Sequence, residues 1–463
     1  MGAAALAPVI PSCAPDGTTS GGSQPLPTFS AALVAQRIKH VVVLMMENRS
    51  FDQYFGALSL QGRTDINGLV TGMSNPLANG SPVAIAPADA FCVGDPPHGW
   101  NPCHAQFNQG ANDGFVREHE RRWGAAEAHR VMGYFDGTDL TALYGLLPSG
   151  VLCQQWHASV MGPTWPNRYH LMCTTSRGQK ANVGIVGPVD NIFSSLNEKR
   201  IDWNNHYGNI PFSILLDGQS LEDPAYKYLE QFHDDAAAGN LPPFTLIDPI
   251  YGRNDDHPPT HPVAGQILIQ SVYTSLAQSP HWNESLLIVT YDEHGGFFDH
   301  VPPPTTVDDF ASQGFDQLGF RVPSMVLGPY VKAGLVDNTL RDHTTVYRTL
   351  AELWGLKSIT AREAAATSLL NVLDEDRIVN NNPAPPVMLP PIVADDAVIH
   401  AEECNGQRFF PRPGSGGITG QPELEQLAMA RFGTHPKMRL GTTENAYQNF
   451  LDVARGQGVL KRR

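Results

Sequence analysis

Short runs of apolar and β-branched residues recur along this chain, each followed by polar residues and often by glycine. The runs His40–Met46 and Leu286–Tyr291 are too short to cross a membrane and predict strands buried on both faces of a parallel sheet. Further strands are expected around Val151–Val160, Phe212–Leu216, Phe244–Ile247 and Val322–Leu327. Helical segments lie between them, from about Pro166 and over Asp223–Ala238, His261–Gln278 and Thr344–Trp354. This alternation predicts an α/β fold with a mostly parallel central sheet sandwiched between helices.

Composition divides the chain into three expected regions. Residues 1–36 are rich in Gly, Pro, Ser and Ala and predict an extended lead-in. Residues 37–378 form the main α/β domain, in which segment 57–135 is loop-rich, as is typical of a loop over an active site. Residues 379–463 read as a Pro/Gly-rich linker and a C-terminal helical appendage, with helices at about Glu423–Phe432 and Glu444–Ala454.

The overall charge limits the possible partners. The 463 residues are 41% apolar and carry a formal net charge of -15. Such an acidic chain is a poor match for nucleic acid, because phosphate contacts need clustered Lys and Arg. It also disfavours tight docking on anionic lipid, although transient contact with a zwitterionic membrane surface stays open. No run approaches the ~20 apolar residues of a membrane helix, so we expect no transmembrane segment.

The six cysteines form no zinc-finger pattern. Cys92 with Cys103, and Cys153 with Cys173, are close enough in sequence for two local disulfides, and buried free thiols are the alternative. The N-terminus lacks the basic region of a signal peptide. A secreted or periplasmic location is expected on indirect grounds alone.

Two acidic residues stand where a predicted strand ends. Asp292 and Glu293 follow Leu286–Tyr291 directly, and Gly295 and Gly296 allow the chain to turn sharply. In open α/β sheets the chemistry lies beyond the carboxyl ends of the strands. Adjacent carboxylates repel each other, so a bound cation explains the pair. A solvated acidic turn is the alternative.

A second strand end carries similar side chains. His40–Met46 is followed by Glu47 and Asn48, and then by Ser50, which fits the N-cap of a short helix. The two strand ends together offer oxygen ligands only, which suit one divalent metal ion such as Ca²⁺, Mg²⁺ or Mn²⁺ better than Zn²⁺. For Glu47 and Asn48 alone, helix capping is the alternative.

A candidate nucleophile lies in the sequence GPTWPNR. Pro166 suits the first turn of a helix, so Thr164 would lie at a helix N-terminus, where free N–H groups favour phosphate. A hydroxyl becomes a good nucleophile when a metal or base activates it. A structural threonine in a proline-flanked turn is the alternative. Arg168 fits a phosphate contact or a salt bridge.

Histidines are numerous, 17 in all, and several lie beside acids or prolines. Histidine can hold phosphate oxygens or protonate a leaving group because its pKa lies near neutral pH. A packed or exposed histidine without a chemical role is the alternative for each. The candidates are His98, His104, His257, His294, His300 and His343.

Four motifs resemble, in order, those of the bacterial phosphoesterase family, which contains phospholipases C and an acid phosphatase. They are MENRSFDQYFG, GPTWPNR, TYDEHGGFFDHVPPP and GFRVPSMVLGPYVKAG, between about His40 and Trp354. The resemblance implies an alkaline-phosphatase-like fold and a single metal. It also implies five metal ligands, with Thr164 as both ligand and nucleophile: Glu47, Asn48, Thr164, Asp292 and Glu293. His257 matches the family's His-Pro motif, where it would contact an oxyanion or the leaving group.

The chain departs from the family around His98. Where the family carries an Asp-His and a Trp-Asn pair, this sequence reads PPHGW and QFNQG, so the roles of His98 and His104 are not separated. The longer phospholipases carry additional C-terminal β domains, for which this chain has no room.

These observations predict a metal-dependent phosphoester hydrolase. We expect a phospholipase C that cleaves phosphatidylcholine-like lipids to diacylglycerol and phosphocholine through a phosphothreonine at Thr164. Asn48 and His343 would bind substrate, and His257, His98 or His104 would protonate the leaving alcohol. One alternative is an acid phosphatase acting on soluble phosphomonoesters, and another is a catalytically silent binding protein with the same fold.

Overall fold

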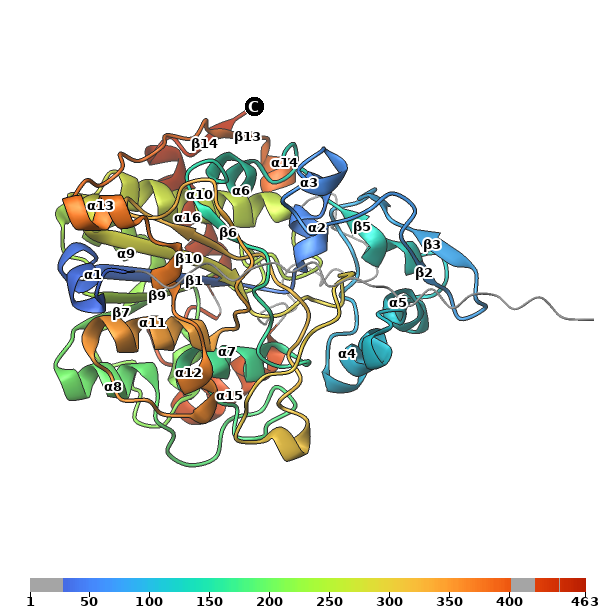
Figure 1. Cartoon of the computed structure of the whole chain (residues 1–463), viewed down its shortest axis with the longest axis horizontal. Coiled ribbons are helices and arrows are strands. Elements are labelled where there is room, and N and C mark those ends of the chain that lie inside the picture. Colours follow the sequence, from blue (N-terminus) through green and yellow to red (C-terminus); the bar gives the residue numbers. More distant parts are fainter. Residues whose placement is uncertain (1–27, 401–420, 441) are drawn as a thin grey trace, which may run out of the picture.

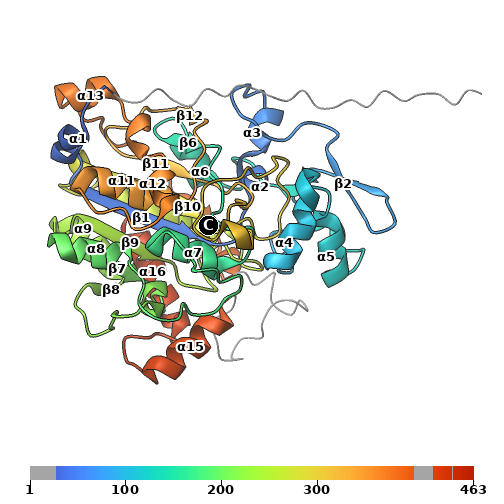
Figure 2. The same ribbon diagram turned by 60° about the horizontal axis from the view of Figure 1, so that its bottom comes forward.

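The computed structural model describes residues 28–400, 421–440 and 442–463. Its centre is an eight-stranded sheet in the order β12-β6-β11-β10-β1-β9-β7-β8 (Figures 1 and 2), and Figure 2 labels all eight strands. Of these strands β11 alone runs antiparallel to its neighbours, which confirms the expected α/β fold with a mostly parallel sheet. The bounds are β1 (His40–Met46), β6 (Val151–Cys153), β7 (Trp203–Tyr207), β8 (Tyr226–Tyr228), β9 (Phe244–Asp248), β10 (Ser285–Tyr291), β11 (Met325–Leu327) and β12 (Val336–Asp337).

The register of the central strands positions the acidic residues. In β1, every residue from His40 to Met46 pairs in parallel with β10, so Met46 lies opposite Tyr291. All residues of both strands are buried, which explains their continuous apolar sequence. Because the two strands end at the same level, the residues that follow them emerge side by side.

Helices cover both faces of the sheet, as Figures 1 and 2 show. One group packs together above the sheet in Figure 1 and consists of α6 (Thr141–Leu146), α9 (Leu229–Ala238), α10 (Pro262–Ala277) and α16 (Thr443–Gly456). The opposite group consists of α1 (Ala31–Arg37), α7 (Thr164–Cys173), α8 (Ile192–Lys199) and α11 (Thr344–Trp354). The predicted helices over 261–278 and 344–354 are therefore confirmed.

A loop-rich segment lies beyond the carboxyl end of β1 in both views (Figures 1 and 2). It contains a separate apolar cluster in which Phe115 contacts Phe298 and Phe320. This packing holds the segment against the end of the sheet. Its elements are α2 (Phe51–Phe55), α3 (Ala57–Leu60), β2 (Ser74–Pro76), β3 (Pro82–Ala84), β4 (Ala86–Pro87), α4 (Trp100–Phe107), α5 (Phe115–Trp123) and β5 (Gly133–Tyr134).

The remaining elements are short and lie mostly towards the C-terminus. The helices are α12 (Ala361–Ala365), α13 (Glu375–Asn380), α14 (Asp396–Ile399) and α15 (Pro422–Phe432), and the strands are β13 (Ile392–Ala394) and β14 (Leu460–Arg462). Short 3₁₀ helices occur at Asn108–Gly110, Ala128–Met132, Phe212–Leu215, Trp282–Glu284, Ala311–Gln313 and Leu369–Val372. No helix in these described ranges has the length and apolar content to cross a bilayer.

Several expected elements differ from the structure. Of the predicted strand Val151–Val160, only Val151–Cys153 forms a strand, β6. The predicted strand Phe212–Leu216 is a 3₁₀ turn that follows Pro211. The strand of the sheet is instead β7, which the sequence pattern did not predict because its residues are mostly polar. The predicted helix Asp223–Ala238 divides into β8 and α9. Within the predicted lead-in, Ser30 caps α1, so residues 31–37 are helical; residues 1–27 lie outside the described residues.

The C-terminal segment packs onto the same core as the sheet. Its two predicted helices are present as α15 and α16, and Tyr447, Phe450 and Leu451 of α16 are buried in the main apolar core. Residues 401–420 of the expected linker lie outside the described residues. The segment is thus continuous with the α/β domain where it is described.

The predicted disulfide pairs are wrong. Cys103, Cys153 and Cys173 are buried free thiols, which confirms the alternative for the second pair. Cys92 is disulfide-bonded, but not to Cys103. Proximity in sequence is therefore a poor guide to pairing here.

Candidate active site

The ends of β1 and β10 are joined by backbone hydrogen bonds. Asp292 N donates to Met46 O at 3.1 Å, and Arg49 N donates to Glu293 O at 3.1 Å. Asn48 has a φ of 58° and its N–H donates to Asp292 Oδ1 at 2.9 Å. These bonds fix the side chains of Glu47, Asn48, Asp292 and Glu293 in one buried place, as the sequence predicted.

Gly295 makes this close approach possible. Gly295 and Gly296 have φ values of 64° and 75°, the left-handed conformation that glycine adopts without strain. A Cβ on Gly295 would lie 2.2 Å from Asn48 O, so a side chain there would push the two strand ends apart. The predicted sharp turn after the strand is therefore present, and it also lets the two strand ends pack closely against each other.

Three buried oxygens at these strand ends lack a hydrogen-bond partner among the described residues. They are Asn48 Oδ1, Asp292 Oδ2 and Glu293 Oε1. Burial raises the pKa of Glu293 to about 8, and burial also raises the pKa of Asp292. Burying an oxygen without a hydrogen-bond partner costs free energy, and one bound cation can satisfy several such oxygens at once. The residues thus fit a hard, oxygen-binding divalent metal ion.

Glu47 differs from the other acids because both of its oxygens already have partners. Arg168 Nε donates to Glu47 Oε1 at 2.9 Å, and Gln421 Nε2 donates to Glu47 Oε2 at 2.9 Å. Arg168 also reaches Asp248 Oδ1 at 3.3 Å, and its Nε lies 3.9 Å from Asp292 Oδ2. Arg168 therefore makes a salt bridge, one of its two expected roles. A metal bond from Glu47 would use the lone pairs that remain on its oxygens.

Thr164 is the first residue of α7 and is buried. It lies one turn before Arg168, so both side chains project from the same side of the helix. Asn167 holds the preceding turn, because its Nδ2 donates to the carbonyls of Val160, Gly162 and Pro163. Arg168 bonds to Glu47, so this face of α7 is directed at the strand ends.

His98 lies beside the orphaned oxygens. Its Nε2 is 3.4 Å from Asn48 Nδ2 and 3.8 Å from Glu293 Oε1. Its Nδ1 is 2.7 Å from Pro96 O and 3.3 Å from Asp95 Oδ1. Although burial opposes it, the negative charges of Asp95 and Glu293 raise the pKa of His98 well above its ordinary value. Asp95 was missed in the sequence because two prolines separate it from His98.

His257 is the second histidine of this cluster. Its ring lies 5.8 Å from that of His98 at an angle of 80°, and its Nδ1 donates to Pro258 O at 2.6 Å. Burial lowers the pKa of His257. The preceding residues tie the loop to β1, because Glu47 N donates to Asp255 O at 2.8 Å. The structure therefore brings His257 and His98 together.

His343 and His104 are placed differently. His343 Nε2 donates to Asp292 O at 2.7 Å and its Nδ1 accepts from Trp156 Nε1 at 3.2 Å. The ring therefore supports the backbone at Asp292. Both ring nitrogens of His343 are thus bonded within the protein, and its expected substrate contact stays a prediction. His104 Nδ1 donates to Trp100 O at 2.7 Å and its ring stacks on that indole. In the described part of the chain no contact joins His104 to the strand ends.

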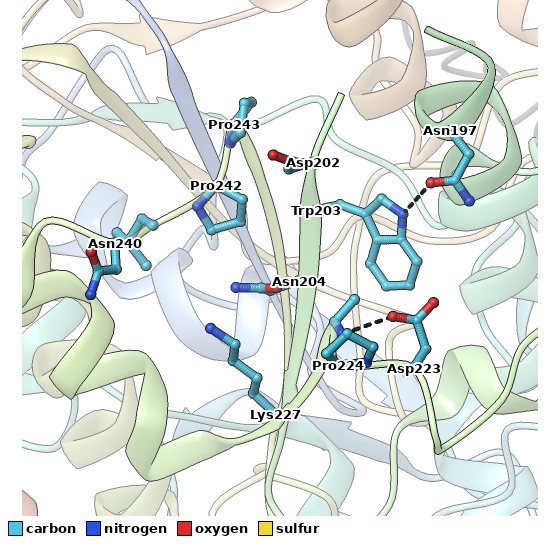
Figure 3. A pocket seen from close by; sticks show the side chains of 12 residues that line it. Asn197, Asp202, Trp203, Asn204, Asp223, Pro224, Lys227, Asn240, Pro242 and Pro243 are labelled. Atoms are coloured by element: carbon cyan, nitrogen blue, oxygen red, sulfur yellow. Dashed lines mark hydrogen bonds between the residues drawn. The ribbon is translucent and has the colours of Figure 1, made fainter. Parts of the chain in front are cut away.

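A cavity of about 610 Å³ lies elsewhere (Figure 3). Trp203, Ala225 and Pro243, which stand at the amino ends of β7, β8 and β9, line it together with Lys227. These strands run parallel to β1. The cavity therefore lies at the amino ends of the strands, whereas Glu47 and Asp292 lie at the carboxyl ends. It is therefore not part of the candidate active site.

The chain resembles known phosphoester-cleaving enzymes in sequence. Residues 38–357 match the model of the phosphoesterase family. Non-specific phospholipase C6 from Arabidopsis thaliana is 32% identical over 86% of this chain and 81% of the plant protein. Non-hemolytic phospholipase C from Pseudomonas aeruginosa is 26% identical over 87% of this chain and 66% of the bacterial protein. A solved Vibrio parahaemolyticus protein in the alkaline phosphatase superfamily aligns with a TM-score of 0.38, at 11% identity over 74% of this chain and 72% of that chain.

The family match and the relatives named phospholipase C show that this α/β protein is a hydrolase acting on phosphoester bonds. The family match covers more than half of the chain and includes every candidate ligand from Glu47 to Glu293. The chain belongs to the phosphoesterase family, which confirms the resemblance seen in its motifs.

Proposed function

We propose that this protein is a metal-dependent phospholipase C that cleaves phosphatidylcholine-like lipids through a covalent intermediate on Thr164. The observation that supports it most is the set of orphaned oxygens at two strand ends, Asn48 Oδ1, Asp292 Oδ2 and Glu293 Oε1. Relatives named phospholipase C support the choice of a phospholipid. A divalent ion bound by these oxygens would neutralise the carboxylates, polarise the phosphoryl oxygens and lower the pKa of the Thr164 hydroxyl.

Thr164 is the proposed nucleophile because it combines a hydroxyl with a helix N-terminus. At the start of α7 the Trp165 N–H already donates to Asn182 Oδ1 at 3.0 Å, and Pro166 has no N–H. The helix dipole and the N–H of Thr164 itself are therefore what would favour the negative charge of the phosphate. Thr164 Oγ1 loses its proton and forms a bond to phosphorus while the bond to the diacylglycerol oxygen breaks. Water then attacks the phosphothreonine, the bond from phosphorus to Oγ1 breaks, and Thr164 regains a proton as phosphocholine leaves.

His98 is the proposed proton donor to the departing alcohol. Pro96 O and Asp95 anchor its Nδ1, so Nε2 is the nitrogen that faces Asn48 and Glu293. The neighbouring His257 is held by Pro258 O and packs edge-on against the His98 ring. His257 thereby helps to fix the direction of His98 and borders the same space.

Contact with the lipid surface is proposed for the segment 57–135. This segment lies beyond the carboxyl end of β1 in Figures 1 and 2, and its Val70 is 60% exposed. The net charge of -15 favours a brief encounter with zwitterionic lipid over stable binding to an anionic membrane.

The first experiment compares Thr164→Ala with Thr164→Ser on phosphatidylcholine vesicles. Alanine removes the nucleophile and should lower kcat by about 10³-fold or more, whereas serine keeps a hydroxyl and should retain measurable activity. Chelation should abolish the activity, and Ca²⁺, Mg²⁺ or Mn²⁺ should restore it. Near wild-type turnover by Thr164→Ala with metal present contradicts the assignment.

The second experiment separates lipid hydrolysis from phosphatase activity. p-Nitrophenyl phosphorylcholine is a diester with the headgroup, and p-nitrophenyl phosphate is the matching monoester. We expect faster turnover of the diester, and faster turnover of the monoester would favour an acid phosphatase. His98→Ala should slow hydrolysis of phosphatidylcholine far more than that of the nitrophenyl diester, whose leaving group needs no proton.

A further inference from the structure

Two histidines and a glutamate lie together at the amino ends of β1 and β10, far from the candidate active site. His40 is the first residue of β1 and pairs with Ser285, the first residue of β10. His281 and Glu284 belong to the short turn that leads into β10. The seven residues of β1 separate this cluster from Glu47 by about 20 Å. It is therefore independent of the catalytic chemistry.

The three side chains converge. The ligand atoms that His40, His281 and Glu284 can offer lie within 4.8 Å of one another. The two imidazole rings are 4.1 Å apart between centroids, and His281 Nδ1 lies 3.7 Å from Glu284 Oε2. Two ligand atoms on a tetrahedral Zn²⁺ are about 3.3 Å apart, so small side-chain rotations suffice to close the site.

Each histidine has one ring nitrogen fixed by a backbone carbonyl. His40 Nδ1 donates to Pro242 O at 3.0 Å, and His281 Nε2 donates to Gly239 O at 2.8 Å. Each ring then keeps a lone pair on its other nitrogen, His40 Nε2 and His281 Nδ1. Metal-binding histidines are usually held in this way, because the carbonyl fixes both tautomer and ring direction. Pro242 also lines the cavity of Figure 3, which lies at the same amino ends of the strands.

The backbone around the cluster is rigid and one side is open to solvent. Lys39 N donates to Glu284 O at 2.8 Å, and Ser285 Oγ donates to His281 O at 2.7 Å, so both parts of the turn are tied down. The side chains of His281 and Glu284 are 24% and 34% exposed, which leaves a path for an ion and its water ligands.

We propose that His40, His281 and Glu284 form a second metal site that takes Zn²⁺ or a similar borderline cation such as Co²⁺. Two imidazoles and one carboxylate, with water in the remaining position, suit zinc and not Ca²⁺ or Mg²⁺. The oxygen ligands at the other end of the sheet have the opposite preference. Lys39 Nζ pairs with Glu284 Oε1 and therefore competes with the metal for this carboxylate.

The test is zinc binding to the full chain, measured by isothermal titration calorimetry with saturating Ca²⁺ to fill the oxygen site. The wild type should bind one more equivalent of Zn²⁺ than His281→Ala. His129→Ala is the matched control, because His129 is a partly exposed histidine paired with one acid, Asp89, and it should keep the wild-type stoichiometry. Equal zinc stoichiometry in the wild type and His281→Ala overturns the proposal.

Two further variants test the carboxylate and guard against misfolding. Glu284→Gln should weaken zinc binding at least about tenfold, and Lys39→Met should strengthen it by releasing the carboxylate. An unchanged affinity in both overturns the role of Glu284. Phosphoester hydrolysis in the presence of Ca²⁺ should be the same in all of these variants, so this test stands or falls separately from the proposed function.

Discussion

Gln421 donates its side-chain amide to Glu47 Oε2 at 2.9 Å, although the two residues are 374 positions apart in the chain. The other end of the same amide accepts from Trp165 Nε1 at 3.0 Å. One side chain of the C-terminal segment therefore connects the end of β1 to the first turn of α7. The segment takes part in positioning the candidate nucleophile and ligands.

Replacing Gln421 by alanine should destabilise the protein and impair catalysis together. The change leaves the buried Trp165 Nε1 and Glu47 Oε2 without partners, at a cost of about 1–3 kcal/mol in the free energy of unfolding. Urea unfolding measures the loss, and kcat on phosphatidylcholine should fall in parallel. Gln448→Ala is the control, because this glutamine is exposed and bonds only to Asp452 among the described residues. Equal stability of the two variants would contradict a linking role for Gln421.

Arg168→Lys should make folding more dependent on divalent metal. Lysine keeps the positive charge but cannot donate to Glu47, Asp248 and Met45 O at once, as the guanidinium does. The buried carboxylates then depend more on a bound cation, so the rise in Tm on adding Ca²⁺ should be larger than in the wild type. Thermal unfolding with and without chelator measures this difference. An identical metal-induced shift in both proteins would argue against a shared role in charge compensation.

Gly295→Ala should separate the two strand ends and reduce metal-supported activity. The positive φ of Gly295 alone costs about 1 kcal/mol with alanine, and the new Cβ also meets Asn48 O at 2.2 Å. Gly80→Ala is the matched control, because its φ is 85° and a Cβ there meets nothing within 4 Å. Activity should fall at least tenfold in the first variant and stay near wild type in the second. A Gly295→Ala enzyme with normal kcat would show that the close approach is dispensable.

Asp256 gives a pH dependence whose sign follows from its pKa. Its Oδ2 accepts from Tyr54 Oη at 3.0 Å and Tyr291 Oη at 2.6 Å, and burial raises its pKa to about 6 from 3.8. The folded protein therefore binds the proton more tightly, and Asp256 contributes stability at low pH that is lost as pH rises from about 4 to about 6. The loss amounts to about 3 kcal/mol.

Asp256→Asn cannot titrate, so it should lack this part of the decline. Urea unfolding at pH 4 to 7 should show the wild type losing stability relative to Asp256→Asn over that window, with a constant difference above it. The exposed Asp217→Asn should follow the wild-type curve. Parallel curves for wild type and Asp256→Asn would contradict a buried, protonatable Asp256.

The sheet centre was predictable because its strands are apolar throughout. β1 and β10 are buried on both faces, so their side chains leave a continuous hydrophobic run. β7 was missed because its sequence, WNNHY, is polar although fully buried. Asn205 and His206 are tolerated there through contacts with Asp248 and Asp235, which are remote in sequence. The sequence pattern of a single segment gives no information about partners that are remote in the chain.

The candidate site was predictable to the extent that it lies at strand ends. The strand pattern correctly placed Asn48, Asp292 and Glu293 at two neighbouring strand ends, where each has a buried oxygen without a hydrogen-bond partner among the described residues. Gln421 could not be found, because a single glutamine after a Gly-rich stretch has no distinguishing pattern. The contact of His343 with Asp292 O could not be predicted either, because the sequence at a helix start is the same whether its histidine faces a substrate or a backbone carbonyl.

In the proposed reaction, Thr164 carries the phosphoryl group during turnover. Acid quenching within the first turnover on phosphatidylcholine, followed by proteolysis and mass spectrometry, tests it directly. We expect a phosphocholine adduct on the peptide that contains Thr164, formed in the wild type and absent in Thr164→Ala. Full hydrolytic activity with no adduct, or an adduct on a different residue, would contradict it.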